Sequence, residues 1–402
     1  MTSRSLRPRL RLTGAALILA VVTACSSQGA SPDAGSTKKN SAEVDKTSQA
    51  TIASNIRPGA KGVDLDRKLR LRADSGTFES VQVAGPKGGV VEGRLSAEKT
   101  RWVSQTQLQA GSRYRVTSTA VDSDGVQKNY ESRFETRTLT LDEQTYPSFV
   151  PVQDQTVGVG MPVVIRFDVP VTDHASIERN LEVVSQPAQA GSFHWISDQE
   201  VHWRPRQYWQ PGTDVTVRAD IGGVPAGNGI YGQTDRRMKF KVGDAMVSKV
   251  NMETHEMRVF RNGKMVRNIP ITTGEQPKYT TRSGTKVIVE KFRQKRMNSE
   301  TIGIDPNSAD GYDLNNVEYA MRLTYSGEFV HAAPWSVGQQ GSANVSHGCT
   351  GMSTENAEWL YNNTNVGDVI EYVGSDKGMT LTNGFGDWNT SFKDYRAGSA
   401  LS

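Results

Sequence analysis

An internal repeat with an offset of 101 residues restricts the fold more than any other feature of this chain. Residues 109–116 read QAGSRYRV, and residues 210–217 read QPGTDVTV. The same offset carries Trp102 onto Trp203. Because about 100 residues is the usual size of one small domain, the repeat indicates two tandem copies of the same fold.

Both copies consist of short runs in which apolar and polar residues alternate, separated by turn signals, and neither has a helical period. The spacing of Leu108, Gly111 and Tyr114 resembles the tyrosine corner of immunoglobulin-like sandwiches. We therefore expect Ig-like domains over residues 51–146 and 147–244. Neither of the chain's two cysteines lies in these ranges, which excludes the inter-sheet disulfide of antibody domains.

Composition narrows the possible partners. The formal net charge is +4, and no basic run is interleaved with aromatic residues as a single-strand nucleic-acid platform requires, so no nucleic-acid partner is predicted. Aromatic residues are concentrated in the second unit, where their alternation favours core and edge packing over a sugar-binding site. His194 and His202 of that unit show no carboxylate or thiolate companions in the sequence, so no metal site is predicted there.

Residues 1–24 have the pattern of an export signal, in which arginines precede an apolar run at residues 14–22 that is too short to span a membrane. The segment ends in Val-Thr-Ala before Cys25 and resembles a bacterial lipobox. That resemblance implies lipidation of Cys25 and anchoring at the outer face of the cytoplasmic membrane, in the cell-wall space. An ordinary signal peptide cut nearby is the alternative. Residues 25–50 contain no aromatic residue and are predicted to be a flexible tether.

The second cysteine is the candidate nucleophile. If Cys25 is acylated, Cys349 has no disulfide partner, and an unpaired cysteine in an exported protein indicates a reactive thiol. An isolated cysteine is more often a buried structural residue. Here the preceding Ser-His-Gly favours a tight turn with exposed N–H groups. Because a thiol attacks as the thiolate, it needs a base, and His331, eighteen residues earlier, is the natural one.

The residues around the cysteine have predicted supporting roles. The N–H groups of Gly348, Cys349 and Thr350 are expected to form an oxyanion hole. A helix capped by Ser353 would direct its partial positive charge towards the thiolate. His347 is expected to point away from the thiol and to hold the loop by a hydrogen bond.

Residues 245–374 are predicted to form a third, mostly β domain with one short helix after the nucleophile. Its first hairpin is indicated by Asn262 and Gly263, which lie between two alternating runs. The C-terminal extension, residues 375–402, carries Trp388. Because a free tail would not need such a side chain, we expect the extension to pack on the catalytic domain or on an Ig-like domain.

The third unit resembles the YkuD-type L,D-transpeptidase domain at His331, the SHGC motif of residues 346–349, the TTG of residues 272–274, Thr281 and Gly284. The order of parts is lipobox, tether, two Ig-like domains, catalytic domain and aromatic tail. This order is similar to that of the actinobacterial lipoprotein L,D-transpeptidases, so the resemblance covers nearly the whole chain.

By this resemblance Cys349 is the nucleophile, His331 is the proton acceptor, and the main-chain carbonyl of Ala332 orients the imidazole. The positions that match the substrate site and its lid are Tyr312, Ser326, Gly327, Met297 and Trp335. Gly351 also matches a substrate-contacting position, where the family usually has Asn or Arg. Arg282 stands where the family has proline.

The resemblance implies acyl transfer between peptidoglycan stem peptides without a metal or a cofactor. A donor tetrapeptide stem would lose D-alanine to give a thioester, and an amine of an acceptor stem would resolve it as a 3→3 cross-link. β-Lactams of the carbapenem class would act as covalent inhibitors. Two alternatives remain: an L,D-carboxypeptidase of the same fold, and a non-catalytic wall-binding lipoprotein in which Gly351 has cost the activity.

Overall fold

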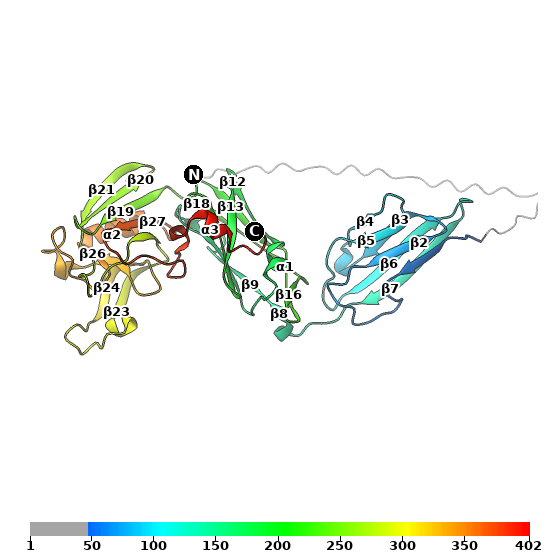
Figure 1. Cartoon of the computed structure of the whole chain (residues 1–402), viewed down its shortest axis with the longest axis horizontal. Coiled ribbons are helices and arrows are strands. Elements are labelled where there is room, and N and C mark those ends of the chain that lie inside the picture. The colour runs from blue at the N-terminus through cyan, green and yellow to red at the C-terminus, as the bar shows by residue number, and fades with distance from the viewer. Residues whose placement is uncertain (1–46) are drawn as a thin grey trace, which may run out of the picture. The chain divides into compact units, whose positions relative to one another are not determined.

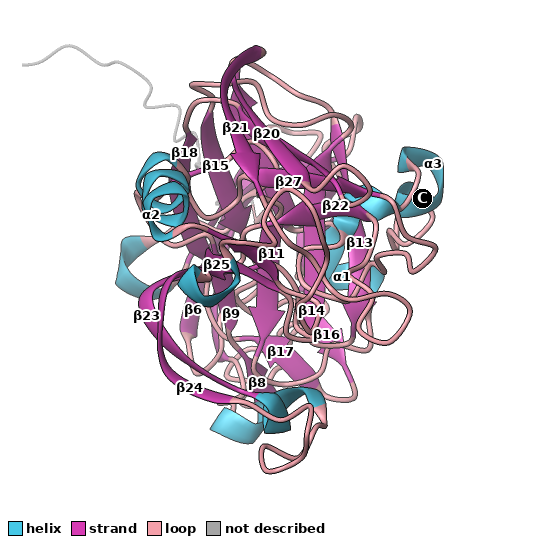
Figure 2. Cartoon of the chain, turned by 90° about the vertical axis from the view of Figure 1, so that its left-hand side faces the viewer, coloured by secondary structure: helices cyan, strands magenta, loops and turns pink. Residues whose placement is uncertain are grey.

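The computed structural model describes residues 47–402 (Figure 1). The predicted signal peptide, the predicted lipidation residue Cys25 and most of the predicted tether lie outside the described residues. As the sequence predicts, the described chain is mainly β, with strands in three successive regions and few helices (Figure 2). None of the helices in residues 47–402 is long and apolar enough to cross a membrane.

The first region is a sandwich of two sheets, with strand orders β1-β2-β5-β4 and β3-β6-β7. Its elements are β1 (Thr51–Ser54), β2 (Arg70–Asp74), β3 (Thr77–Ala84), η1 (Pro86–Gly88), β4 (Gly93–Leu95), β5 (Arg101–Ser104), β6 (Arg113–Val121), β7 (Gln127–Glu135) and η2 (Leu141–Glu143). The predicted tyrosine corner is present, since the hydroxyl of Tyr114 accepts a hydrogen bond from the main-chain N–H of Gln109 at 2.7 Å.

The second region is also a two-sheet sandwich, with strand orders β10-β18-β15-β12 and β13-β14-β11-β9, and a small third sheet, β16-β17-β8. Its elements are β8 (Gln144–Thr145), β9 (Pro147–Val150), β10 (Thr156–Val157), β11 (Val163–Phe167), α1 (His174–Glu178), β12 (Leu181–Gln186), β13 (Gly191–Ser197), β14 (Glu200–Pro205), β15 (Asp214–Ala219), β16 (Pro225–Gly227), β17 (Ile230–Gly232) and β18 (Arg236–Val242).

The repeat in the sequence corresponds to the same packing in both sandwiches. Trp102 on β5 lies across Gly93 on β4, where an added Cβ would come within 2.1 Å of the indole ring. Trp203 on β14 lies in the same way across Gly191 on β13, where an added Cβ would come within 2.2 Å. In each copy, a large ring therefore fills the space that a glycine leaves on the neighbouring antiparallel strand.

The third region contains the sheets β21-β20-β19-β27-β22 and β23-β24-β25-β26. Its elements are β19 (Met246–Asn251), β20 (Glu256–Arg261), β21 (Lys264–Pro270), β22 (Gly284–Val287), β23 (Glu290–Asn298), η3 (Ser299–Ile302), β24 (Asp313–Arg322), β25 (Phe329–Ala332), η4 (Pro334–Ser336), β26 (Thr350–Met352), α2 (Thr354–Asn363) and β27 (Val369–Val373). The hairpin turns at Asn262 and Gly263, both with positive φ. Ser353 caps α2, since its Oγ accepts from the N–H of Asn356 at 3.3 Å.

The C-terminal extension contacts both the second sandwich and the catalytic sheet, and it contains η5 (Asp387–Asn389) and α3 (Phe392–Arg396). The indole N–H of Trp388 donates to the carbonyl of Gly160 at 2.7 Å. The amide of Asn389 donates to the carbonyl of Thr285 on β22 at 2.7 Å. The extension therefore joins segments of the chain that are far apart in sequence.

The extension also corrects the expectation for His202. Its imidazole has two carboxylate companions: Nε2 lies 2.8 Å from Glu200, and Nδ1 lies 2.9 Å from Asp387 of the extension. Because both ring nitrogens face carboxylate oxygens, this is a buried ionic bridge. Within residues 47–402 no group of His, Cys, Asp and Glu side chains is placed to hold a metal.

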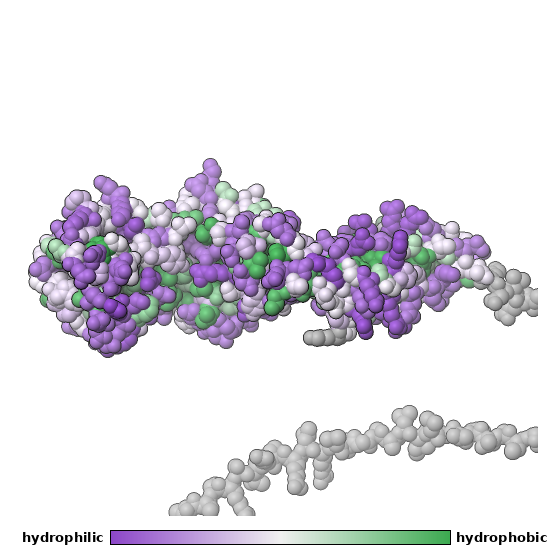
Figure 3. All heavy atoms as spheres, turned by 90° about the horizontal axis from the view of Figure 1, so that it is seen from below, coloured by the Kyte–Doolittle hydropathy of each residue, from purple (hydrophilic) through white to green (hydrophobic). Residues whose placement is uncertain are grey.

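Apolar side chains form three buried clusters, one for each β region. The cluster of the second sandwich extends to Val287 and Val369 on the catalytic sheet. The space-filling view shows hydrophilic residues over much of the visible face, with smaller hydrophobic patches among them (Figure 3). This distribution fits the alternating pattern of the strands, which places one face in the core and the other in water.

Candidate active site

The candidate nucleophile and base lie on neighbouring strands. Cys349 directly precedes β26, and His331 lies on β25. The two strands pair in parallel, with His331 opposite Gly351. The side chains of His331 and Cys349 line one cavity of about 350 Å³, a size within the range of small-molecule sites. Parallel pairing thus brings together two residues that the chain separates.

Most of the other predicted site residues surround the thiol. The first cavity is also lined by Met297, Tyr312, Trp335, His347 and Gly351. Gly327 borders a second cavity of about 200 Å³ that also reaches Cys349, and its carbonyl accepts a hydrogen bond from Cys349 Sγ at 3.6 Å. Ser326 lines neither of these two cavities. Its main-chain N–H donates to Asn383 Oδ1 at 2.9 Å, so it joins the active-site loop to the C-terminal extension.

The loop before the nucleophile is a tight turn closed by its own side chains. Ser346 Oγ donates to the carbonyl of Cys349 at 2.6 Å and accepts from the N–H of Gly348 at 3.2 Å. Gly348 has φ +119°, which favours glycine. Thr281 Oγ1 donates to the carbonyl of Gly348 at 2.9 Å. The N–H of Gly348 donates to Ser346 Oγ, so in this structure it is not available for the oxyanion hole that the sequence predicted.

The imidazole of His331 has a defined orientation. Its Nδ1 lies 2.7 Å from the carbonyl of Ala332, which can only accept, so Nδ1 carries the proton. This leaves Nε2 as the acceptor nitrogen. Burial lowers the pKa of His331 below its usual value, which favours the neutral form that a general base needs.

The thiol of Cys349 has a raised pKa, although a helix expected to favour the thiolate follows it in the chain. Burial raises the pKa of its thiol to about 11, so the thiol is protonated at neutral pH. Helix α2 begins at Thr354, beyond the three residues of β26. The dipole of a helix acts within its first turn, and Cys349 lies five residues before the first residue of α2. The thiol therefore depends on a neighbouring base.

Two rings frame the cavity. His347 is held by aromatic contacts, not by the expected hydrogen bond: its ring centroid lies 4.3 Å from that of Tyr279 and 5.1 Å from that of Tyr312. Its Nε2 is buried without a hydrogen-bond partner among the described residues. Trp335 is 58% exposed, and its ring stacks on that of His331 with centroids 5.9 Å apart. Its position suits a lid over the base.

Gly351 is required by close packing on β26. Its N–H donates to the carbonyl of Thr272, and its carbonyl accepts from the N–H of Thr272, both at 2.9 Å. An added Cβ would lie 2.9 Å from the Cβ of Ala333 and 3.1 Å from the Cγ2 of Thr272. Main-chain pairing with Thr272 therefore holds Gly351 in place, at the position where the resemblance led us to expect Asn or Arg.

Gly351→Ala is expected to destabilise the protein by about 1–3 kcal/mol, as overpacking typically does, and to slow acylation of Cys349 by moving its loop. Thermal unfolding and the rate of imipenem acylation test this. The double variant Gly351→Ala/Ala333→Gly should regain most of the loss, because the facing methyl group is gone. A Gly351→Ala protein as stable and as fast as wild type would contradict the packing argument.

Sequence reasoning missed several residues around the loop. The side chain of Asn344 accepts from the N–H of Thr273 and donates to the carbonyl of Met252. Lys286 and Glu328 form a buried ion pair beside the nucleophile loop. The available signal for that pair was a lysine, Lys286, placed directly before the apolar run Val-Ile-Val.

Comparison with known proteins agrees with this geometry. A family described as bacterial Ig domain matches residues 60–225, and one described as L,D-transpeptidase catalytic domain (YkuD) matches residues 246–371. L,D-transpeptidase 2 of Mycobacterium tuberculosis is 34% identical over 355 residues, which cover 87% of this chain and 85% of that protein. L,D-transpeptidase 1 of the same species is 40% identical over 227 residues, which cover 56% of this chain and 84% of that protein.

Among solved structures, LD transpeptidase LdtMt1 in complex with imipenem is 39% identical, with a TM-score of 0.49, over 56% of this chain and 97% of that chain. The similarity to L,D-transpeptidase 2 extends over most of both proteins and includes the Ig-like and catalytic regions. The chain therefore belongs to the L,D-transpeptidase family, with a bacterial Ig region followed by a YkuD catalytic domain.

Proposed function

We propose that this L,D-transpeptidase uses Cys349 as its nucleophile and His331 as its base to form 3→3 cross-links between peptidoglycan stems. The observation that carries the proposal is the pairing of β25 and β26, which places the thiol and the imidazole in one cavity. His331 presents Nε2 as an acceptor, and the high pKa of the thiol makes such an acceptor necessary.

In the acylation step, Sγ of Cys349 forms a bond to the carbonyl carbon of the third residue of a donor tetrapeptide stem. The thiol proton passes to Nε2 of His331 and then to the leaving amine, so that the C–N bond breaks and D-alanine departs. In the second step, the side-chain amine of an acceptor stem attacks the thioester. His331 takes the amine proton and returns it to the sulfur as the C–S bond breaks.

Two cavities that both reach Cys349 favour transfer to an acceptor stem over release to water. The larger is lined by His331 and Trp335, and the smaller by Gly327 and by the basic residues Lys295 and Arg322. Donor and acceptor peptides therefore have separate approaches to the same sulfur. An L,D-carboxypeptidase would need room for water alone at the second approach.

We expect β-lactams of the carbapenem class to acylate the same thiol. Support comes from the related LD transpeptidase LdtMt1, which has been solved in complex with imipenem. A strained cyclic amide presents a carbonyl to Sγ as the donor stem does, and the ring nitrogen takes the proton when the ring opens.

Intact-protein mass spectrometry after imipenem or meropenem is the test of function. Wild type should gain one covalent adduct, and Cys349→Ala should gain none. With a tetrapeptide-stem substrate, wild type should release D-alanine and form a cross-linked dimer. Tripeptide without dimer would establish the carboxypeptidase instead, and an unmodified wild type would support the non-catalytic alternative.

The proposed location is the outer face of the cytoplasmic membrane, through a lipid on Cys25. The proposal rests on the export pattern and the lipobox-like residues before Cys25. Metabolic labelling with a palmitate analogue tests it: label that persists in Cys25→Ala would exclude this residue as the anchor.

A further inference from the structure

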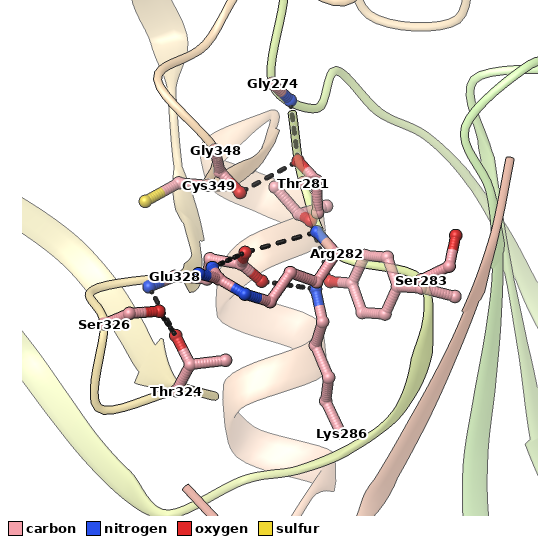
Figure 4. Close-up of polar contacts among 12 residues, drawn as sticks. Gly274, Thr281, Arg282, Ser283, Lys286, Thr324, Ser326, Glu328, Gly348 and Cys349 are labelled. Atoms are coloured by element: carbon pink, nitrogen blue, oxygen red, sulfur yellow. Dashed lines mark hydrogen bonds and ion pairs between the residues drawn. The ribbon is translucent and has the colours of Figure 1, made fainter. Parts of the chain in front are cut away.

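Three charged side chains meet in a buried cluster beside the nucleophile loop (Figure 4). Glu328 directly precedes β25, Lys286 lies on β22, and Arg282 lies just before β22. Lys286 Nζ contacts Glu328 Oε2, and the Arg282 guanidinium donates to Glu328 Oε1 at 2.8 Å. Lys286 is 0% exposed and Glu328 is 5% exposed. We call these three residues the ion triad.

The ion triad is adjacent to Cys349 because of the strand register. Val330 lies opposite Thr350 in the parallel pair of β25 and β26, so Glu328, two residues earlier, lies beside Gly348. The Glu328 Cγ atom is 3.9 Å from the position that a Gly348 Cβ would occupy. Figure 4 shows the Glu328 side chain directed towards Arg282 and Lys286.

The ion triad also links the elements that carry the nucleophile and the base. The main-chain N–H of Arg282 donates to Glu328 Oε1 at 3.2 Å. Its neighbour Thr281 donates to the carbonyl of Gly348 and accepts from the N–H of Gly274. One short segment, residues 281–282, thus holds the nucleophile loop by a threonine and the start of the base-bearing strand by Glu328.

This arrangement places a carboxylate next to a thiol that must lose its proton. Burial is the largest cause of the raised pKa of Cys349, the Glu328 carboxylate raises it further, and the Lys286 ammonium lowers it. Burial lowers the pKa of Lys286 to about 8, and Glu328 opposes that shift. The charged and titratable side chains that surround the thiol include Glu328, Lys286, His331, Tyr312 and Tyr372. His347 lines the larger cavity beside it, and the smaller cavity adds Lys295, Arg296, Arg322 and Tyr325.

Lys286 also makes a cation–π contact with a tyrosine that contacts the nucleophile loop. Its Nζ lies 3.7 Å from the ring centroid of Tyr372, and the hydroxyl of Tyr372 is 2.7 Å from Thr350 Oγ1. Thr350 is the residue directly after the nucleophile. The lysine therefore packs between the carboxylate beside Gly348 and the tyrosine that contacts Thr350, and it has no access to water.

We propose that Glu328 is a positioning residue that aligns the nucleophile loop with the base-bearing strand, and that Lys286 balances its charge so that the Cys349 thiolate can form. This inference rests on the proposed role of Cys349 as nucleophile. The carboxylate of Glu328 accepts hydrogen bonds from the main chain and the guanidinium of Arg282. The negative charge of the same carboxylate disfavours the Cys349 thiolate. The ammonium of Lys286 offsets this negative charge. The hydrogen bonds from Arg282 hold Glu328 against residues 281–282.

The test follows alkylation of Cys349 by iodoacetamide in the full chain, with peptide mass spectrometry to assign the site, from about pH 6 to about pH 10. Lys286→Met removes the buried ammonium and leaves Arg282 as the remaining cation paired with Glu328, so alkylation at neutral pH should slow on the order of tenfold, and its pH profile should move to higher pH. Lys286→Arg should retain the wild-type profile. Lys249→Met, on the exposed surface of β19, is the matched control and should also retain it.

The decisive variant is the double change Lys286→Met/Glu328→Gln. It removes both charges, so its pH profile should return towards that of wild type. If Lys286 and Glu328 only stabilised the fold, the double variant should be alkylated at least as slowly as Lys286→Met. Either that order or an unchanged profile in Lys286→Met would overturn the proposal, provided that thermal unfolding shows folded protein.

Alkylation does not require transpeptidation. A wild-type protein without a carbapenem adduct would therefore refute the proposed function, while the alkylation profiles would still report on the ion triad. The imipenem acylation rate adds a second readout. In the double variant, the rate of imipenem acylation should stay below that of wild type even where alkylation recovers. The reason is that the Glu328 carboxylate no longer holds residues 281–282 in place.

Discussion

His331→Ala is expected to slow acylation of Cys349 by imipenem by about 10²–10⁴-fold, the usual effect of removing a general base. The reason is the thiol itself. Burial raises its pKa to about 11, and helix α2 begins beyond β26. Among the described residues that line the cavity, His331 alone presents a ring nitrogen oriented by a main-chain carbonyl. Without it the proton must leave to water.

The acylation rate is measured by mass spectrometry of the adduct over time, and thermal unfolding verifies that the fold is intact. His174→Ala in the second sandwich is the matched control and should acylate as wild type does. The pKa of His331 is lowered, so wild type should keep its rate down to mildly acidic pH, until the imidazole is protonated. An acylation rate that does not change in His331→Ala would rule out the role as base.

His202→Ala is expected to destabilise the second sandwich and the C-terminal extension by about 3–5 kcal/mol, the typical cost of removing one partner from a buried ion pair. His202 is 2% exposed, and its partner Asp387 is 0% exposed. After the substitution, the hydroxyl of Tyr395, at 2.9 Å, remains as a donor to Asp387. The Tyr395 hydroxyl is neutral, so the negative charge of Asp387 would be left buried without a cationic partner between the sandwich and the extension.

The same bridge predicts how stability depends on pH. Asp387 and Glu200 raise the pKa of His202 from 6.5 to about 9 in spite of its burial, which acts in the opposite direction. A group whose pKa is raised in the folded state contributes stability that is complete below its unfolded pKa. This contribution should be lost as the pH rises from about 6.5 through about 9.

Urea unfolding of wild type and His202→Ala at about pH 6 and about pH 9.5 tests both statements. The difference in the free energy of unfolding between wild type and His202→Ala should be large at the lower pH and smaller at the higher pH. His174→Ala is again the matched control, because His174 pairs with an exposed carboxylate of Asp198 and should show little effect. An equal difference at both pH values would contradict the ionic bridge.

Local signals in the sequence were sufficient for much of the fold. The alternation of apolar residues predicted strands, because a strand exposes its two faces with a period of two. The turn at Asn262 and Gly263 and the cap at Ser353 follow from the dihedral and hydrogen-bonding preferences of single residues. These properties belong to a few consecutive residues, so no knowledge of distant contacts was needed.

The sequence also predicted Cys349 as nucleophile and His331 as base, and both side chains line one cavity. It did not predict their environment. Strand β26 lies in the chain between Cys349 and the helix expected to favour the thiolate, and burial raises the pKa of the thiol. His347 packs between Tyr279 and Tyr312, not in a hydrogen bond. Burial and ring packing depend on the whole surroundings of a residue, which adjacent letters do not contain.

By itself, the sequence determined the tandem β repeat, the hairpin, the capped helix and the residue types of the candidate catalytic pair. Only the tertiary structure decided which charges meet: His202 with Asp387, and Lys286 with Glu328. The physical reason is that an ion pair is chosen by strand register and by the packing of distant segments. The apolar run after Lys286 marks this lysine as unusual, but only the folded contacts identify Glu328 as its partner.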